Sequence, residues 1–207
     1  DDPLKDFDGF IALANSGRLT DFQLVVVDGA PTDYDYEKWL PKETMVLRRK
    51  SWSEMPDFYR WVRGSAGVVV STSRLESFGL CVMEAQACGC PVVVPSVGGM
   101  AEILEDQSSG RYYDRSEGVD GIVRGVRWIY EGDNYTRTSE RAVEHVERNY
   151  SARKMCEDYS SVYESAMAEN GHAKPNPLGK AFVAMSMSAA QAARGLLHRG
   201  GTGQAND

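Results

Sequence analysis

Histidine, cysteine and long apolar runs are scarce in this chain of 207 residues. It contains three histidines and four cysteines, and it has no Cys-x-x-Cys pair near a histidine, which is the spacing that a zinc site requires. We therefore predict no zinc site. No apolar run reaches the length of a membrane-spanning helix, and the first residues lack the pattern of a signal peptide. These absences fit a reduced, cytoplasmic setting.

An excess of positive charge is missing as well. The chain has 23 Lys and Arg against 30 Asp and Glu, a formal net charge of −7. A general nucleic-acid-binding protein would have a basic face, so we predict no nucleic-acid partner. The composition, 42% hydrophobic and 26% charged, is that of a globular α/β domain large enough to bury a core.

Valine-rich runs alternate with helical patterns, and the clearest unit spans residues 67–103. It predicts a strand at 67–70 that is buried on both faces, a helix at 79–88 and a second buried strand at 91–95. Gly89 is predicted to end the helix in the left-handed conformation. Strand, helix and strand in this order are typical of a parallel sheet, in which ligands bind at the carboxyl ends of the strands.

Similar patterns fill the rest of the chain. In the helix at 79–88 we expect Leu80, Met83 and Ala87 on the apolar side, and we interpret Cys81 and Cys88 as small core residues. Other strands are expected at 22–27, 44–47 and 110–113, and other helices at 7–14, 53–61, 119–130, 138–148 and 152–167. Ser53 is expected to cap the helix at 53–61, whose buried side would be Phe58, Tyr59, Trp61 and Val62. Ser151 is expected to cap the helix at 152–167.

Two carboxylates stand beside the start of the helix at 79–88. Glu76 precedes the helix, and Glu84 lies in its second turn. The backbone amides of Phe78, Gly79 and Leu80 are expected to be free at this helix N-terminus. Amides suit phosphate oxygens and carboxylates suit sugar hydroxyls, so the group fits a ligand that carries both. For an isolated pair of glutamates, two solvated side chains would be the simpler interpretation.

The stretch S-x-x-E-S-F-G-L-x-x-x-E-A-x-A-C-G-x-P-V-V from Ser73, followed by V-G-G-x-x-E, resembles the donor-domain signature of retaining GT-B glycosyltransferases of glycosyltransferase family 4. The resemblance implies an α/β fold, a Rossmann-like parallel sheet with helices on both faces, as in the C-terminal half of a GT-B enzyme. It also implies a nucleotide-sugar donor and no required metal. By it, Glu76 is catalytic and holds the transferred sugar, while the substrate-binding residues are Glu84 for the ribose and Ser73, Ser77, Phe78, Gly79 and Leu80.

The same resemblance assigns a catalytic role to Lys5. Pro3-Leu4-Lys5 before the first helix is similar to the family's loop with an arginine and a lysine that bind the donor diphosphate; the arginine would fall one position before Asp1. A strand is also expected before that helix and is absent from the sequence. We therefore expect the first strand and the N-terminal acceptor domain to be missing, and the chain to be weakly active by itself. An ordinary solvated lysine remains the alternative for Lys5.

The predicted organisation is a donor-binding domain at 1–168, a linker at 169–177, an amphipathic helix at 178–199 and a disordered tail at 200–207. The helix is expected to pack on the missing domain or on a partner, with peripheral membrane contact as an alternative. Asp33-Tyr34-Asp35 resembles a D-x-D metal motif, but we interpret it as a loop. The basic cluster at 48–50 is interpreted as a solvated turn, with contact to the donor phosphate or base as the alternative.

The predicted function is retaining glycosyl transfer from a nucleotide-sugar, with UDP as the expected nucleotide, to an unidentified acceptor. Pro3-Leu4-Lys5 together with E-A-Q-A-C-G is similar to enzymes that pass N-acetylglucosamine from UDP to inositol phosphate. Two alternatives stay open: a GT-B nucleotide-sugar epimerase, and a non-catalytic nucleotide-binding or assembly module. The sequence leaves the oligomeric state open.

Overall fold

The computed structural model describes residues 4–27, 35–47, 49–104 and 107–169. The chain divides into two compact units, residues 1–146 and 147–207. The predicted linker, C-terminal helix and tail lie outside the described residues, apart from residue 169. All predicted site residues belong to the first unit.

The first unit alternates strands and helices, as the sequence predicts. Two 3-10 turns, η1 (Tyr36–Lys38) and η2 (Arg115–Glu117), lie between these elements. In chain order the strands and helices are α1 (Phe7–Asn15), β1 (Val25–Val27), β2 (Met45–Leu47), α2 (Met55–Gly64), β3 (Val69–Val70), α3 (Leu80–Ala87), β4 (Val92–Pro95), α4 (Met100–Ile103), β5 (Arg111–Tyr113), α5 (Gly118–Ile129) and α6 (Asn134–Asn149), whose last residues belong to the second unit.

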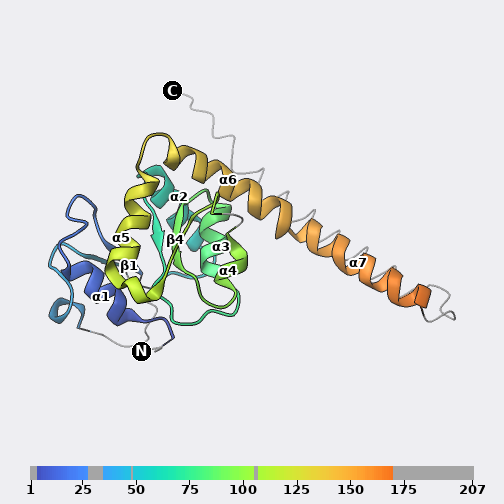
Figure 1. Ribbon diagram of the computed structural model, residues 1–207, viewed down its shortest axis with the longest axis horizontal. Helices are drawn as coiled ribbons and strands as arrows, with labels where there is room; N and C mark the ends of the chain where they lie inside the picture. Colours follow the sequence, from blue (N-terminus) through green and yellow to red (C-terminus); the bar gives the residue numbers. More distant parts are fainter. Residues whose placement is uncertain (1–3, 28–34, 48, 105–106, 170–207) are drawn as a thin grey trace, which may run out of the picture. The chain divides into compact units, whose positions relative to one another are not determined.

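Every strand pair in the described residues is parallel, which confirms the predicted topology. The strands form a two-stranded sheet, β1-β2, and a three-stranded sheet in the order β3-β4-β5. Helices cover both faces of β4: α5 packs against β4 and β5 and also contacts α1, whereas α3 packs against β4 and contacts α2. Figure 1 shows α5 and α3 on opposite sides of β4.

The burial of the strands differs from the prediction at one point. All four residues of β4 are buried, as expected, and Val93 packs into a core with Leu13 of α1 and Ile122 of α5. The strand at 67–70, however, is only half-buried over Val69–Val70. It pairs with β4 on one side and forms an edge of its sheet, so the prediction of burial on both faces is wrong.

The apolar side of α3 also differs from the prediction. Met83 is buried, but Leu80, Cys81 and Ala87 are exposed and Cys88 is half-buried. The buried side consists of Val82, Met83, Ala85 and Gln86, because α3 packs against both α2 and β4. In a short helix whose residues are mostly apolar, the periodicity of apolar residues does not show which side is buried. The left-handed conformation of Gly89 is confirmed, with φ +78°.

Two predictions for α2 are wrong. Ser53 does not cap this helix, which begins after Glu54; instead the Glu54 carboxylate accepts hydrogen bonds from the backbone amide and hydroxyl of Ser51. Trp61 is exposed rather than buried, whereas Tyr59 lies in the core and Phe58 and Val62 are half-buried.

The second unit contains α7 (Ala152–Glu169), at the predicted position. The amide of Lys154 donates to the Ser151 hydroxyl at 3.2 Å, which confirms the predicted cap. The apolar residues of α7 are exposed: Met155, Tyr159, Val162 and Tyr163. Within the described ranges, no helix is both long enough and apolar enough to cross a membrane.

Replacing Val93 by alanine tests the central position of β4. The change removes two buried methyl groups from a packed core, so we expect the free energy of unfolding to fall by about 2 kcal/mol. The matched control is Val46→Ala in β2, where the side chain is partly exposed and the expected change is about 0.5 kcal/mol or less. Urea unfolding followed by circular dichroism measures both; equal losses would contradict the central burial of β4.

Candidate functional site

The candidate site lies where loops leave the carboxyl ends of β3, β4 and β5. Residues 71–79 follow β3, residues 96–99 follow β4 and residues 114–117 follow β5. The loops touch: the Tyr113 hydroxyl donates to the carbonyl oxygen of Ser71 at 3.0 Å, and the Gly99 amide donates to the carbonyl oxygen of Glu76 at 2.9 Å. Parallel pairing therefore gathers these loops at one edge of the sheet, as the sequence predicts.

The segment before α1 joins this edge through Lys5 and Glu76. The Lys5 ammonium lies 2.5 Å from Glu76 Oε2, and the side chains are 54% and 15% exposed, respectively. The two residues are 71 positions apart in the sequence. The structure thus brings together the two residues that the resemblance assigns to catalysis, which disfavours an isolated solvated lysine.

Glu84 has a partner that the sequence did not suggest. The indole Nε1 of Trp52 donates to Glu84 Oε1 at 3.2 Å, and Trp52 is 83% exposed. Trp52 follows β2, so it reaches the site from the other sheet. A hydrogen-bonded yet exposed aromatic ring beside Glu84 offers a flat apolar surface to a ligand.

Exposed side chains surround the N-terminus of α3, the helix that carries Glu84. Ser77, Phe78 and Leu80 are exposed, and Gly79 takes a left-handed conformation with φ +78° as the residue before the helix. In the described part of the chain, the amides of Gly79 and Leu80 donate to no other group. Amides of this kind at a helix N-terminus can bind an anion, and the predicted role of these two stays a prediction.

Ser73, like Gly79, is a predicted site residue that is buried. Its hydroxyl accepts a hydrogen bond from the Ser71 hydroxyl at 3.2 Å, and its carbonyl oxygen accepts one from Arg115 at 3.0 Å. These contacts hold the loop after β3 in place.

Gly98 and Gly99 allow the loop after β4 to lie directly against the Glu76 segment. A Cβ atom on Gly98 would lie 2.4 Å from the carbonyl oxygen of Glu76, and one on Gly99 would lie 2.1 Å from that of Ser77. Both distances are too short for any side chain, so these glycines permit the close backbone contact on which the position of Glu76 depends.

Asp6, missed by the sequence reasoning, makes ion pairs between three segments. Its buried carboxylate accepts from Arg74 at 2.9 Å and from Arg115 at 2.7 Å. Burial by itself would raise the pKa of this carboxyl, but the hydrogen bonds and charges of the two arginines outweigh it and hold the pKa below its ordinary value. Arg74 lies 68 positions and Arg115 lies 109 positions from Asp6 in the sequence, so no local sequence signal relates them.

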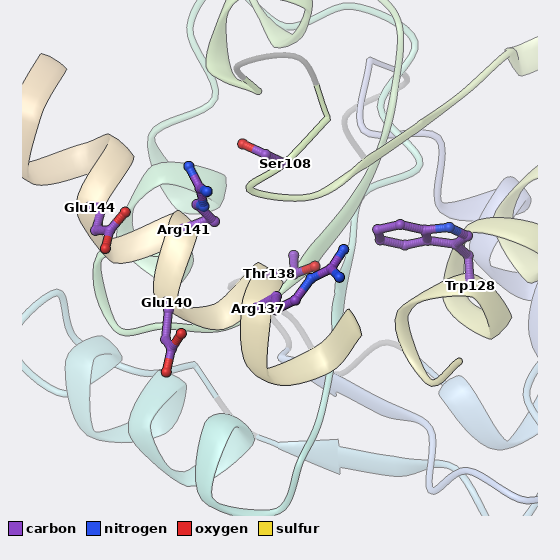
Figure 2. Close-up of a pocket in the computed structure, with 7 residues that line it drawn as sticks. All are labelled: Ser108, Trp128, Arg137, Thr138, Glu140, Arg141 and Glu144. Atoms are coloured by element: carbon purple, nitrogen blue, oxygen red, sulfur yellow. The ribbon is translucent and has the colours of Figure 1, made fainter. Parts of the chain in front are cut away.

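A cavity of about 550 Å³ lies at a different place in the first unit. Figure 2 shows Arg137 and Arg141 on α6, facing Ser108 and Trp128. Ser108 precedes β5, so this cavity is at the opposite end of that strand from the candidate site. Its lining also includes Thr138, Glu140 and Glu144, so two carboxylates balance the charges of the two arginines.

Other predicted features give no competing site. Within the described ranges, no group of three His, Cys, Asp or Glu side chains could hold a metal ion. Asp33 and Tyr34 of the D-x-D sequence and Arg48 of the basic cluster lie outside the described residues. The absence of a metal requirement stays a prediction.

Comparison with solved structures defines the fold as part of a GT-B glycosyltransferase fold. Sucrose-phosphate synthase from Thermosynechococcus elongatus aligns with a TM-score of 0.65 and 20% identity, over 81% of this chain and 44% of that one. HepE from Anabaena, solved in complex with UDP-glucose, aligns with a TM-score of 0.63 and 19% identity, over 80% of this chain and 46% of that one.

Sequence comparison identifies the family. The family model described as glycosyl transferases group 1 matches residues 2–148, and the chain belongs to this family. A D-inositol 3-phosphate glycosyltransferase from Salinispora tropica is 30% identical over 184 residues, which are 81% of this chain and 37% of that protein. The chain thus spans less than two-fifths of this relative's length.

The charge of Asp6 makes a testable contribution to stability. Because its pKa is lower in the folded than in the unfolded chain, where aspartate titrates near pH 3.9, it stabilises the fold above about pH 4. This stabilisation is lost as the pH falls through the folded pKa. We expect Asp6→Asn to be less stable than the parent at pH 7, with the difference shrinking below about pH 4. Urea unfolding over a pH series measures it.

Asp120→Asn is the matched control, because Asp120 pairs with Arg18 at 2.6 Å while both side chains are more than half exposed. Exposed pairs contribute little, so this variant should follow the parent at every pH. If the free energy of unfolding of Asp6→Asn ran parallel to that of the parent from pH 7 to pH 2, the lowered pKa of Asp6 would be contradicted.

Proposed function

We propose that this chain binds a nucleotide-sugar and forms the donor half of a retaining glycosyltransferase, with a UDP-sugar as donor. The observation that carries the proposal is the ion pair between Lys5 and Glu76, which stands just before the N-terminus of α3. The family to which the chain belongs and the UDP-glucose complex of HepE, which has the same fold, support the donor class.

The pairing of Lys5 with Glu76 suits the bond that such an enzyme breaks. In a nucleotide-sugar, the reacting sugar carbon is attached directly to a phosphate oxygen. A group that binds the sugar and a group that binds the phosphate therefore have to be neighbours. Glu76 can accept hydrogen bonds from sugar hydroxyls, and Lys5 can pair with the phosphate.

Lys5 and Glu76 then have different roles in the reaction. When the sugar–phosphate bond breaks, negative charge grows on the departing diphosphate while the sugar becomes oxocarbenium-like. Lys5 and the amides of Gly79 and Leu80 stabilise the diphosphate, because donors held in place stabilise charge without reorganisation. Glu76 orients the sugar and is not assigned as a covalent nucleophile.

Glu84 holds the ribose in this proposal. Trp52 occupies one carboxylate oxygen of Glu84 through its Nε1 hydrogen bond and leaves Oε2 for a ribose hydroxyl. The exposed indole then lies where the base of the nucleotide would follow the ribose, and stacking between them would add affinity.

The related proteins include D-inositol 3-phosphate glycosyltransferases and sucrose-phosphate synthases, whose names imply different acceptors. An epimerase would bind the same donor without an acceptor, and an assembly module would not need Lys5 and Glu76 together.

A calorimetric titration of the chain with UDP, GDP and ADP, without metal, tests the donor site. We expect a preference for UDP, and we expect Glu84→Ala to weaken UDP binding by about 2 kcal/mol, roughly thirtyfold in Kd, because ribose hydroxyls lose a charged acceptor. Glu144→Ala at the other cavity is the control and should leave the affinity unchanged. Equal affinities of the parent and Glu84→Ala would refute the assignment.

Tryptophan fluorescence tests the role of Trp52 independently. The chain has four tryptophans, and Trp52 is the one hydrogen-bonded to Glu84. We expect UDP to quench the emission of the parent and of Trp128→Phe, but not that of Trp52→Phe, since stacking on a base changes the environment of the indole. Quenching that persists in Trp52→Phe would place the nucleotide away from this ring.

A further inference from the structure

Asp6 directly follows Lys5 and has an unusual combination of properties. It is 9% exposed, its backbone is left-handed with φ +51° and ψ +58°, and it precedes the first residue of α1. Aspartate is among the few residues with a Cβ that adopt this conformation at modest cost. Its side chain does not cap α1; both carboxylate oxygens point instead to arginines, Oδ1 to Arg74 and Oδ2 to Arg115.

These arginines connect Asp6 to two of the loops that form the candidate site. Arg74 lies in the loop after β3, and Arg115 lies in the turn after β5. Besides binding Asp6, Arg115 Nη1 donates to the carbonyl oxygens of Thr72 at 2.8 Å and Ser73 at 3.0 Å. One guanidinium therefore holds the loop after β3 and the Asp6 carboxylate at the same time.

Backbone contacts complete the attachment of the Lys5 segment. The Thr72 hydroxyl lies within hydrogen-bonding distance of the carbonyl oxygens of Lys5 at 3.1 Å and Asp6 at 2.9 Å. The amide of Arg74 donates to the carbonyl oxygen of Leu4 at 2.7 Å. The residues on both sides of the Lys5 side chain are thus held against the same loop that carries Glu76.

We propose that Asp6 is a positioning residue of the donor site: its carboxylate, bound by Arg74 and Arg115, fixes the backbone of Lys5 so that the Lys5 ammonium is held at Glu76. This inference rests on the donor role of Lys5 proposed above. Asp6 also engages the guanidiniums of Arg74 and Arg115, whereas the Lys5 ammonium lies at Glu76. A guanidinium released from Asp6 would compete with Lys5 for Glu76 and for phosphate oxygens.

Asp6→Asn is the variant that isolates this role. Asparagine tolerates the left-handed backbone as well as aspartate does, so the local conformation is kept. The charge is lost, and one of the two oxygens that accept from an arginine becomes an NH₂ donor facing a guanidinium. The variant therefore removes the electrostatic link and leaves the backbone preference intact.

Calorimetric titration with UDP provides the first readout. We expect Asp6→Asn to weaken binding on the order of tenfold, and Lys5→Ala to weaken it as well. Because Asp6 acts through Lys5, Asp6→Asn should have little further effect in the Lys5→Ala background, a coupling that a double-mutant cycle measures. Additive losses in the cycle, or unchanged affinity in Asp6→Asn, would overturn the proposal.

Asp21→Asn is the control for the loss of an ion pair as such. Asp21 is paired with Arg127 elsewhere in the first unit, so this variant should keep the affinity of the parent. Arg74→Gln provides a second test if Asp6→Asn folds poorly. Arg74 is largely exposed, its replacement removes only one of the two guanidinium partners, and it should weaken UDP binding less than Asp6→Asn.

Acylation of Lys5 by acetic anhydride, followed by mass spectrometry, gives a readout that needs no nucleotide. An ammonium held at a carboxylate reacts more slowly than an exposed one, so we expect Lys5 to react severalfold faster in Asp6→Asn than in the parent. Lys42, which is exposed, is the internal reference. Unchanged Lys5 reactivity would overturn the positioning role. If the parent chain binds none of the nucleotides, the donor function fails, and this reactivity still decides the role of Asp6.

Discussion

Parallel pairing of β4 with β3 and β5 is the constraint on which the candidate site depends. β4 is fully buried between helices, and its neighbours run in the same direction. The loops after three strands therefore leave the sheet at one edge, whatever their own sequences are. A chain with the same motifs but antiparallel strands would place these loops at opposite ends.

The loops themselves are held by contacts that bridge from one to another. Arg115 donates to backbone carbonyls of the loop after β3 and to the Asp6 carboxylate, and Gly99 contacts the Glu76 backbone. Both oxygens of the buried Asp6 carboxylate accept hydrogen bonds from arginines. A buried carboxylate can stabilise a fold when it is paired in this way. The site is thus built from loops yet has a defined geometry.

The sequence predicts much of this fold because the signals are local. Valine runs and Gly89 identify the strands and the end of α3, and the motif from Ser73 to Val93 gives the candidate site residues. Periodicity failed at Leu80, since a mostly apolar helix leaves its buried side undetermined, and at β3, since a valine run does not show how many neighbours its strand has.

The contacts that the sequence could not predict join distant residues. Asp6 pairs with arginines 68 and 109 positions away, and Trp52 reaches Glu84 across 32 positions. Nothing in the local pattern around Asp6 or Trp52 indicates a partner, because the residues that they contact are far away in the sequence. Only the fold brings them together, and both lie beside residues that the motif assigns.

A crystal structure of the chain with UDP tests the central claim most directly. The account predicts a diphosphate at the N-terminus of α3, within hydrogen-bonding distance of the Gly79 and Leu80 amides and of Lys5, and a ribose at Glu84. A nucleotide bound instead in the cavity lined by Trp128 and Arg137, with the α3 N-terminus empty, would contradict it.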